Sequence, residues 1–101
     1  MARLKRLDQI QIQRGLKPLP GWRFSRNALR RQYRFETFKT AIHFVNAVAA
    51  EAEGLNHHPD IDIRFSRVRV ALSTHDVGGI SSRDLHLARL IEGQARRRHS
   101  V

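Results

Sequence analysis

Residues 53–84, EGLNHHPDIDIRFSRVRVALSTHDVGGISSRD, carry two histidine clusters on either side of a segment that alternates apolar and polar residues. The first cluster is HHP at 57–59, and the second is THD at 74–76. The alternation between them predicts two strands, and a hairpin returns the second cluster towards the first. We therefore expect side chains that titrate near neutral pH to converge at one place.

The histidine spacing alone leaves two interpretations open. Adjacent residues of an extended segment point to opposite faces, so a His-His pair is by itself a weak indication of a site. Pro59 favours an extended His58, just after a helix that ends in the stretch 53–56. Loops beside rigid elements often hold binding groups, but the histidines could equally be ordinary loop and strand residues.

Two alternating segments predict the strands. The apolar positions of the second segment are Ile61, Ile63, Phe65, Val68, Val70 and Leu72. Polar residues lie between them, which predicts a hairpin with a tight connection near Ser66. The alternation at 22–35, interrupted by a turn-like stretch at 25–27, predicts an earlier hairpin. Because Arg31 breaks its apolar face, we expect the second strand of that hairpin to begin at an edge of the sheet.

Three segments have helical periodicity. The first carries Leu4, Leu7, Ile10 and Leu16 and ends at Pro18 and Pro20. The second follows a possible N-cap at Thr37 and has a wide apolar face: a stripe through Phe38, Ile42, Val45, Ala49 and Ala52, flanked by Ala41, Phe44 and Val48. The third opens with the capping-box pair Ser81 and Asp84 and ends before Gly93, leaving residues 94–101 as a frayed basic tail. The order α-β-β-α-β-β-α predicts a single α+β domain over residues 1–101.

Composition limits the partners. The chain has 101 residues, 41% apolar and 28% charged, which is a globular balance in one domain that would benefit from self-association. No apolar run reaches membrane-spanning length and no signal-peptide core is present, so we expect a cytoplasmic protein without a membrane partner. The absence of cysteine excludes disulfides, thiolate metal sites and cysteine nucleophiles.

The net charge of +10 indicates attraction to polyanions such as nucleic acid. The contacts of such a module would be Arg23, Arg34, Arg64 and Arg69 on the sheet. Because the arginines are spread along the chain and form no single block, nucleic acid is not the expected partner. A zinc hydrolase built on the three histidines and Asp76 is weaker still, since their spacing matches no helix-borne zinc signature, and we expect no metal.

Several strings together resemble the signature of the pterin-4a-carbinolamine dehydratases. They are Pro20-Gly21-Trp22, Asn56-His57-His58-Pro59-Asp60, Ser73-Thr74-His75-Asp76, Gly78-Gly79 and Arg83-Asp84. The resemblance covers nearly the whole chain apart from its two tails. It implies an α+β fold with helices on one face of a four-stranded antiparallel sheet, assembled into homodimers or homotetramers.

The resemblance also implies an activity. Members of this family dehydrate the 4a-hydroxytetrahydropterin that aromatic amino acid hydroxylases release, giving quinonoid dihydropterin with no metal or bound cofactor, in tetrahydrobiopterin recycling. By motif position, the catalytic residues would be His57, His58 and His75, and the substrate-binding residues would be Glu53, Asn56, Pro59, Thr74, Asp76, Arg83 and Asp84. Histidine suits proton delivery to a departing hydroxyl and proton removal from a ring nitrogen, because its ordinary pKa lies near 6.5.

Individual roles within this set have alternatives. Glu53 would bind the amino-pyrimidine edge of the pterin or orient a histidine. Asp84 and Arg83 would either serve the pocket directly or act only as a capping acceptor and its ion-pair partner.

The chain also departs from the family pattern. Ile61 stands where a tryptophan is usual, Phe65 replaces the more common tyrosine, and Asn56 takes a place that is often acidic. The missing tryptophan removes an aromatic wall of the pocket. A non-catalytic role as a dimerisation, assembly or transcriptional partner is the alternative within the same fold, and no residue of the chain identifies such a partner.

Overall fold

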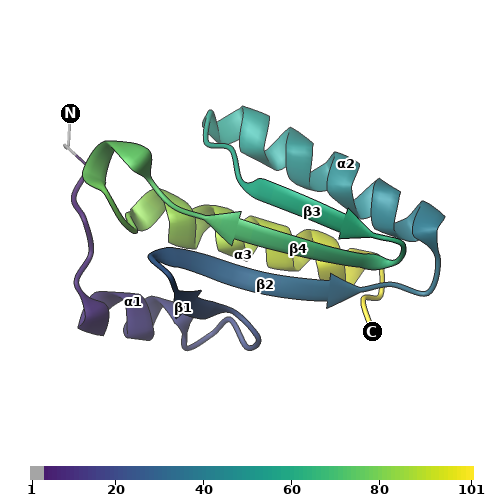
Figure 1. The fold of residues 1–101 in the computed structure, drawn as a ribbon, viewed down its shortest axis with the longest axis horizontal. Coiled ribbons are helices and arrows are strands. Elements are labelled where there is room, and N and C mark those ends of the chain that lie inside the picture. Colours follow the sequence, from purple (N-terminus) through teal and green to yellow (C-terminus); the bar gives the residue numbers. More distant parts are fainter. Residues whose placement is uncertain (1–3) are drawn as a thin grey trace.

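The helices and strands follow one another in the predicted order. The computed structural model describes residues 4–101, so the first three residues of the predicted 1–101 domain lie outside it. Its elements are α1 (Gln9–Leu16), β1 (Arg23–Ser25), β2 (Ala28–Arg34), α2 (Phe38–Leu55), β3 (Asp60–Arg64), β4 (Arg67–Leu72), the short 3-10 helix η1 (His75–Val77) and α3 (Ser82–Arg97). The strands form one antiparallel sheet in the order β1-β2-β4-β3, and α2 and α3 cover one of its faces (Figure 1). The predicted fold class is confirmed.

The strand pairing separates the sheet into a buried and an open face. On the buried face, Leu29 of β2 pairs with Leu72 of β4, and Tyr33 pairs with Val68; each is at most 1% exposed. The intervening residues point to the opposite face, which no helix covers in Figure 1. The predicted edge position of the second strand is wrong, because β2 lies between β1 and β4.

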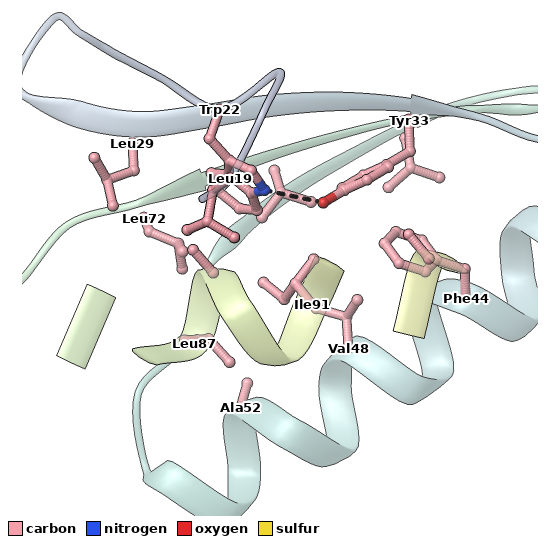
Figure 2. Packing of buried hydrophobic residues seen from close by; sticks show 14 of the residues in the cluster. Leu19, Trp22, Leu29, Tyr33, Phe44, Val48, Ala52, Leu72, Leu87 and Ile91 are labelled. Carbon is pink, nitrogen blue, oxygen red and sulfur yellow. Dashed lines mark hydrogen bonds between the residues drawn. The ribbon is translucent and has the colours of Figure 1, made fainter. Parts of the chain in front are cut away.

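Arg31 lies on the buried face beside two groups that attract its charge, although its Nε forms no hydrogen bond. Its guanidinium carbon lies 4.2 Å from the centre of the Tyr33 ring, and its Nε lies 4.0 Å from a carboxylate oxygen of Glu92. Trp22 Nε1 donates to the Tyr33 hydroxyl at 3.1 Å (Figure 2). Both groups also donate to Glu92, the Tyr33 hydroxyl at 2.6 Å and Trp22 Nε1 at 3.3 Å. Burial and the Glu92 carboxylate raise the pKa of Tyr33, so its hydroxyl remains a donor.

The core lies between the sheet and the helix pair. Phe44, Val48 and Ala52 of α2 face Leu87 and Ile91 of α3 beneath the strands (Figure 2). All five side chains are at most 2% exposed, so this contact joins the two helices into one layer. No helix within residues 4–101 is long and apolar enough to cross a membrane.

The predicted apolar face of α2 is wrong in its centre: the flanking residues are buried, and most of the central stripe is not. The structure buries Ala41, Phe44, Val48 and Ala52, whereas Phe38 is 51% exposed and Ala49 is also exposed. The helix carries apolar residues around most of its circumference, and periodicity alone could not choose among its faces. Its predicted N-cap is confirmed, since the Thr37 side chain accepts a hydrogen bond from Thr40 N.

The N-terminal helix is shorter than predicted. It begins at Gln9 because Asp8 caps it: the Asp8 carboxylate accepts from Gln11 N, and Gln11 returns a bond to Asp8 N. Leu7 precedes the helix and donates its N–H to Ile80 O at 2.7 Å. The helix buries Ile12 and leaves Ile10 61% exposed.

The last helix is longer than predicted, and the predicted frayed tail at 94–101 is wrong. Helix α3 runs through Gly93 to Arg97, and Ala95 is fully buried. Beyond it, Val101 N donates to Arg34 O at 2.7 Å, which docks the chain end on β2. Gly93 did not end the helix because its neighbours Ile91 and Ala95 both belong to the core.

Substitution of two glycines by alanine is expected to change the free energy of unfolding in opposite directions. Gly93 is helical with open space around it, so Gly93→Ala is expected to raise the free energy of unfolding by about 0.5–1 kcal/mol. Gly21 has φ +89°, and an added Cβ would lie 2.5 Å from Arg31 Nε, so Gly21→Ala is expected to lower it. Urea unfolding followed by circular dichroism measures both changes. Equal effects of the two substitutions would contradict this account.

Candidate active site

A left-handed residue turns the chain out of α2 and into the histidine pair. Asn56 has φ +48° and ψ +46°, and its N–H bonds the carbonyl oxygens of Ala52 and Glu53. Asparagine tolerates this conformation better than most residues, which explains its place here. His57 N then donates to Ala52 O at 3.0 Å. The His57 side chain is only 10% exposed, whereas the His58 side chain is 59% exposed, so the adjacent rings occupy different environments.

The His57 ring contacts a fully buried carboxylate. Its Nε2 lies 2.6 Å from Asp84 Oδ1, although 27 residues separate the two in sequence. The other oxygen of Asp84 accepts from the Thr74 hydroxyl at 2.7 Å and from Ser81 N at 2.9 Å. One carboxylate therefore joins the end of α2, the segment after β4 and the first turn of α3.

The direction of each proton in this network follows from its partners. Asp84 as a carboxylate only accepts, so His57 donates its Nε2–H, and Nδ1 is the ring nitrogen outside this pair. Thr74 donates its hydroxyl proton to Asp84, so the Ser81 hydroxyl donates to Thr74 Oγ1 at 2.6 Å. Ser81 Oγ in turn accepts from Arg83 N. Every buried polar atom of this cluster has a partner, which fixes its geometry.

His58 forms a second, exposed pair. Its Nε2 lies 2.5 Å from Glu53 Oε2, and both side chains are more than half exposed. Glu53 lies in the last turn of α2, so the carboxylate reaches across the Asn56 turn to the ring. This contact supports the alternative in which Glu53 orients a histidine.

The third histidine lies on a short turn beside the network. Thr74 and Gly79 pair in an isolated bridge, with Thr74 N donating to Gly79 O at 2.7 Å, and η1 with His75 and Asp76 lies within that loop. Both His75 and Asp76 are exposed. Because Thr74 is bound to Asp84, the backbone at His75 is tied to the carboxylate that holds His57. Convergence of all three rings on one substrate remains a prediction.

Two expectations about the first turn of α3 have different outcomes. The Ser81–Asp84 capping box is confirmed, with Asp84 Oδ2 accepting from Ser81 N. The prediction of an ion pair between Arg83 and Asp84 is wrong. The Asp84 carboxylate is bonded to His57, Thr74 and Ser81, and Arg83 is exposed. Ser81 itself is a member of the network that sequence reasoning missed. The capping-box spacing identified this serine as a helix N-cap, but it did not indicate that the same hydroxyl bonds Thr74.

Two hollows of the surface lie away from the histidines. One of about 610 Å³ lies on the open face of the sheet, and its lining includes Arg23, Arg30, Asp62 and Arg69. A smaller one of about 400 Å³ lies between α1 and β1. Neither of these two hollows is lined by His57, His58 or His75. Across residues 4–101, no three His, Asp or Glu side chains gather in a way that could hold a metal ion.

Known proteins match this chain over most of its length. The family model described as pterin 4 alpha carbinolamine dehydratase matches residues 5–94. A relative from Thermomicrobium roseum, provisionally named a pterin-4-alpha-carbinolamine dehydratase, is 49% identical over 86 residues, covering 85% of this chain and 92% of the relative. A relative from Gloeobacter violaceus with the same provisional name is 45% identical over 89 residues, covering 84% and 97%.

Solved structures agree with the sequence matches. The crystal structure of a transcriptional coactivator/pterin dehydratase from Brucella melitensis has a TM-score of 0.87 at 33% identity, covering 90% of this chain and 99% of that one. A pterin dehydratase-like RuBisCO assembly factor of the alpha-carboxysome has a TM-score of 0.65 at 21% identity, covering 76% and 92%, and shares the fold alone. With the family match over residues 5–94, the chain belongs to the pterin-4-alpha-carbinolamine dehydratase family.

Proposed function

We propose that this protein is a lyase that dehydrates 4a-hydroxytetrahydropterin to quinonoid dihydropterin, with His57, His58 and His75 as its acid–base groups. In this reaction the carbon–oxygen bond to the hydroxyl breaks, and the hydroxyl takes up a proton and leaves as water. A neighbouring ring nitrogen loses its proton as a carbon–nitrogen double bond forms. Positioned side chains that carry both protons accelerate such a step by about 10²–10⁴-fold.

The observation that carries the proposal is the His57–Asp84 pair. A carboxylate on one ring nitrogen selects the tautomer and holds the ring, which leaves the other nitrogen available to a substrate. Asp84 is itself held by Thr74 and Ser81, so the ring is oriented before substrate binds. We assign His57 to the hydroxyl or its departing water and Asp84 to the positioning of His57.

The proton transfers belong to the two exposed rings. His58 is oriented by Glu53 and accessible to a ligand, and His75 is exposed on η1. We assign these two histidines to opposite sides of the reacting centre, where one delivers a proton and the other removes one. Around them, the proposed substrate-binding residues are Glu53, Asn56, Pro59, Asp76 and Arg83. Thr74 and Asp84 of the expected set are buried and bonded to each other, so we assign them to the positioning of His57.

Stopped-flow dehydration of a synthetic carbinolamine tests these roles. His57→Ala, His58→Ala and His75→Ala are each expected to lower the rate, by about 10²-fold or more for at least one of them. His43→Ala on α2 and His86→Ala on α3 are matched controls, because both histidines are exposed on helices outside the site. We expect the controls to keep the rate of the unmodified protein.

Folding and activity are separated by measuring unfolding of every variant. His58 and His75 are exposed, so their truncation is expected to change the free energy of unfolding by less than about 0.5 kcal/mol. If all three site variants remain folded and dehydrate the carbinolamine at the unmodified rate, the catalytic assignment is wrong.

A further inference from the structure

Three arginines lie side by side across one end of the open sheet face. The strand pairing places Arg34 of β2 opposite Arg67 of β4, and Arg67 opposite Arg64 of β3. All three alternate with buried-face neighbours and are exposed, so they share the uncovered face. Neighbouring strands lie about 4.8 Å apart, so three positive charges occupy one short row. We call Arg34, Arg67 and Arg64 the arginine row.

The arginine row is expected to destabilise the sheet. Like charges directly opposite each other on neighbouring strands are destabilising. Asp62 offsets the charge of Arg64, with its carboxylate 3.1 Å from Arg64 Nε. Arg34 and Arg67 form no ion pair with any residue of the described chain, 4–101. A cost without an internal compensation points to an external anion.

The chain adds further features at the same end of the sheet. Phe65 directly follows Arg64 at the tip of the β3–β4 hairpin, is 73% exposed and has φ +53°. A bulky residue in the left-handed region is an outlier, and such outliers gather at functional positions. The bond from Val101 N to Arg34 O brings the C-terminal residue to this end as well (Figure 1).

The positive surface continues along the strands. Arg69 and Arg30 lie on the same face as the arginine row, and Arg23 pairs with Arg30 on the next strand. These three line the hollow of about 610 Å³, with Asp60 and Asp62 on its β3 side. The face therefore presents a positive path, with an exposed aromatic ring at one end and a hollow at the other.

We propose that the open sheet face of this protein binds single-stranded nucleic acid, with the arginine row on the phosphates and Phe65 stacked on a base. Arginine contacts supply the affinity for a phosphate backbone, and aromatic stacking accepts unpaired bases of any sequence. An exposed ring at a hairpin tip has no stacking partner in a duplex, whose bases are already stacked, so the single strand is favoured. This role uses none of the histidines and is independent of the proposed dehydratase activity.

Fluorescence anisotropy with a labelled oligothymidylate of about 12 nucleotides tests the proposal across about 50–300 mM NaCl. The double variant Arg34→Gln/Arg67→Gln is expected to bind more weakly, and its slope of log K against log salt is expected to fall by about 1.4, or 0.7 for each lost phosphate contact. Phe65→Ala is expected to weaken binding at least about fivefold. The matched control is Arg14→Gln/Arg89→Gln, which removes the same charge from exposed positions of α1 and α3.

Thermal unfolding separates binding from folding. Because the like-charge row destabilises the sheet, Arg34→Gln/Arg67→Gln is expected to melt at a temperature equal to or above that of the unmodified protein. The single variant Arg67→Gln, with half the change in slope, provides a second measurement of the same contacts. His58→Ala is expected to bind the oligonucleotide as the unmodified protein does, whatever its dehydration rate.

Three outcomes would overturn the proposal. The first is an equal loss of affinity in the arginine-row variant and in its charge-matched control, which would reduce binding to net charge. The second is unchanged affinity in Phe65→Ala. The third is binding of a duplex of the same length as tightly as the single strand.

Discussion

Asp84→Ala is expected to lower the free energy of unfolding by roughly 3 kcal/mol or more, because it removes the acceptor of three buried hydrogen-bond donors. The Asp84 carboxylate is fully buried and accepts three hydrogen bonds, from His57, Thr74 and Ser81 N. Without it, these donors stay buried with no acceptor, and each unsatisfied donor costs about 1–3 kcal/mol. The first turn of α3 also loses its capping acceptor. Urea unfolding measures the change through its midpoint.

Asp84→Asn separates charge from shape at the same position. The amide keeps one acceptor oxygen but offers N–H groups where the carboxylate had its second oxygen, so one donor of the network then faces another donor. We expect it to cost about 1–3 kcal/mol and to lower the dehydration rate, because His57 loses its fixed tautomer. Asp76→Ala, at an exposed aspartate of η1, is the stability control, with an expected change below about 0.5 kcal/mol. If Asp84→Ala unfolds like Asp76→Ala, the network has no structural role.

The sheet could be predicted because its signals are local. Alternation in 61–72 and the tight connection near Ser66 specify one hairpin without reference to the rest of the chain. The wrong predictions concern residues whose environment is set by distant parts of the chain. Arg31 predicted an edge strand, but the carboxylate that attracts it belongs to Glu92, 61 residues later. The helix continues through Gly93 because Ala95 packs in the core.

Apart from Ser81, the residues of the candidate site could be named from the sequence, but the hydrogen bonds that join them could not. A carboxylate has two oxygens, and the capping box accounts for one of them through Ser81 N. The oxygen that holds His57 is visible only after the end of α2 and the start of α3 have been placed side by side. Sequence patterns assign Asp84 to its own helix, and tertiary packing gives it the second role.

Phe44→Ala is the other substitution with a large expected effect, a loss of about 3–5 kcal/mol in the free energy of unfolding. The Phe44 ring is fully buried, with its centre 5.0 Å from that of Tyr33 and 4.9 Å from that of Phe35. Its removal leaves a cavity between α2 and the sheet, and the surrounding side chains relax only partly into such a space. Calorimetric or urea unfolding measures the loss.

Phe38→Ala on the same helix makes the same chemical change where the ring is 51% exposed, so its expected effect is below about 0.5 kcal/mol. The pair distinguishes the two orientations of α2. Periodicity assigned Phe38 to the buried stripe, whereas the structure buries Phe44 against the sheet. A larger loss in Phe38→Ala than in Phe44→Ala would mean that the helix is rotated. The direction in which the Asn56 turn leads the chain depends on how α2 is rotated about its axis. A rotated helix would therefore leave the contact between His57 and Asp84 unexplained.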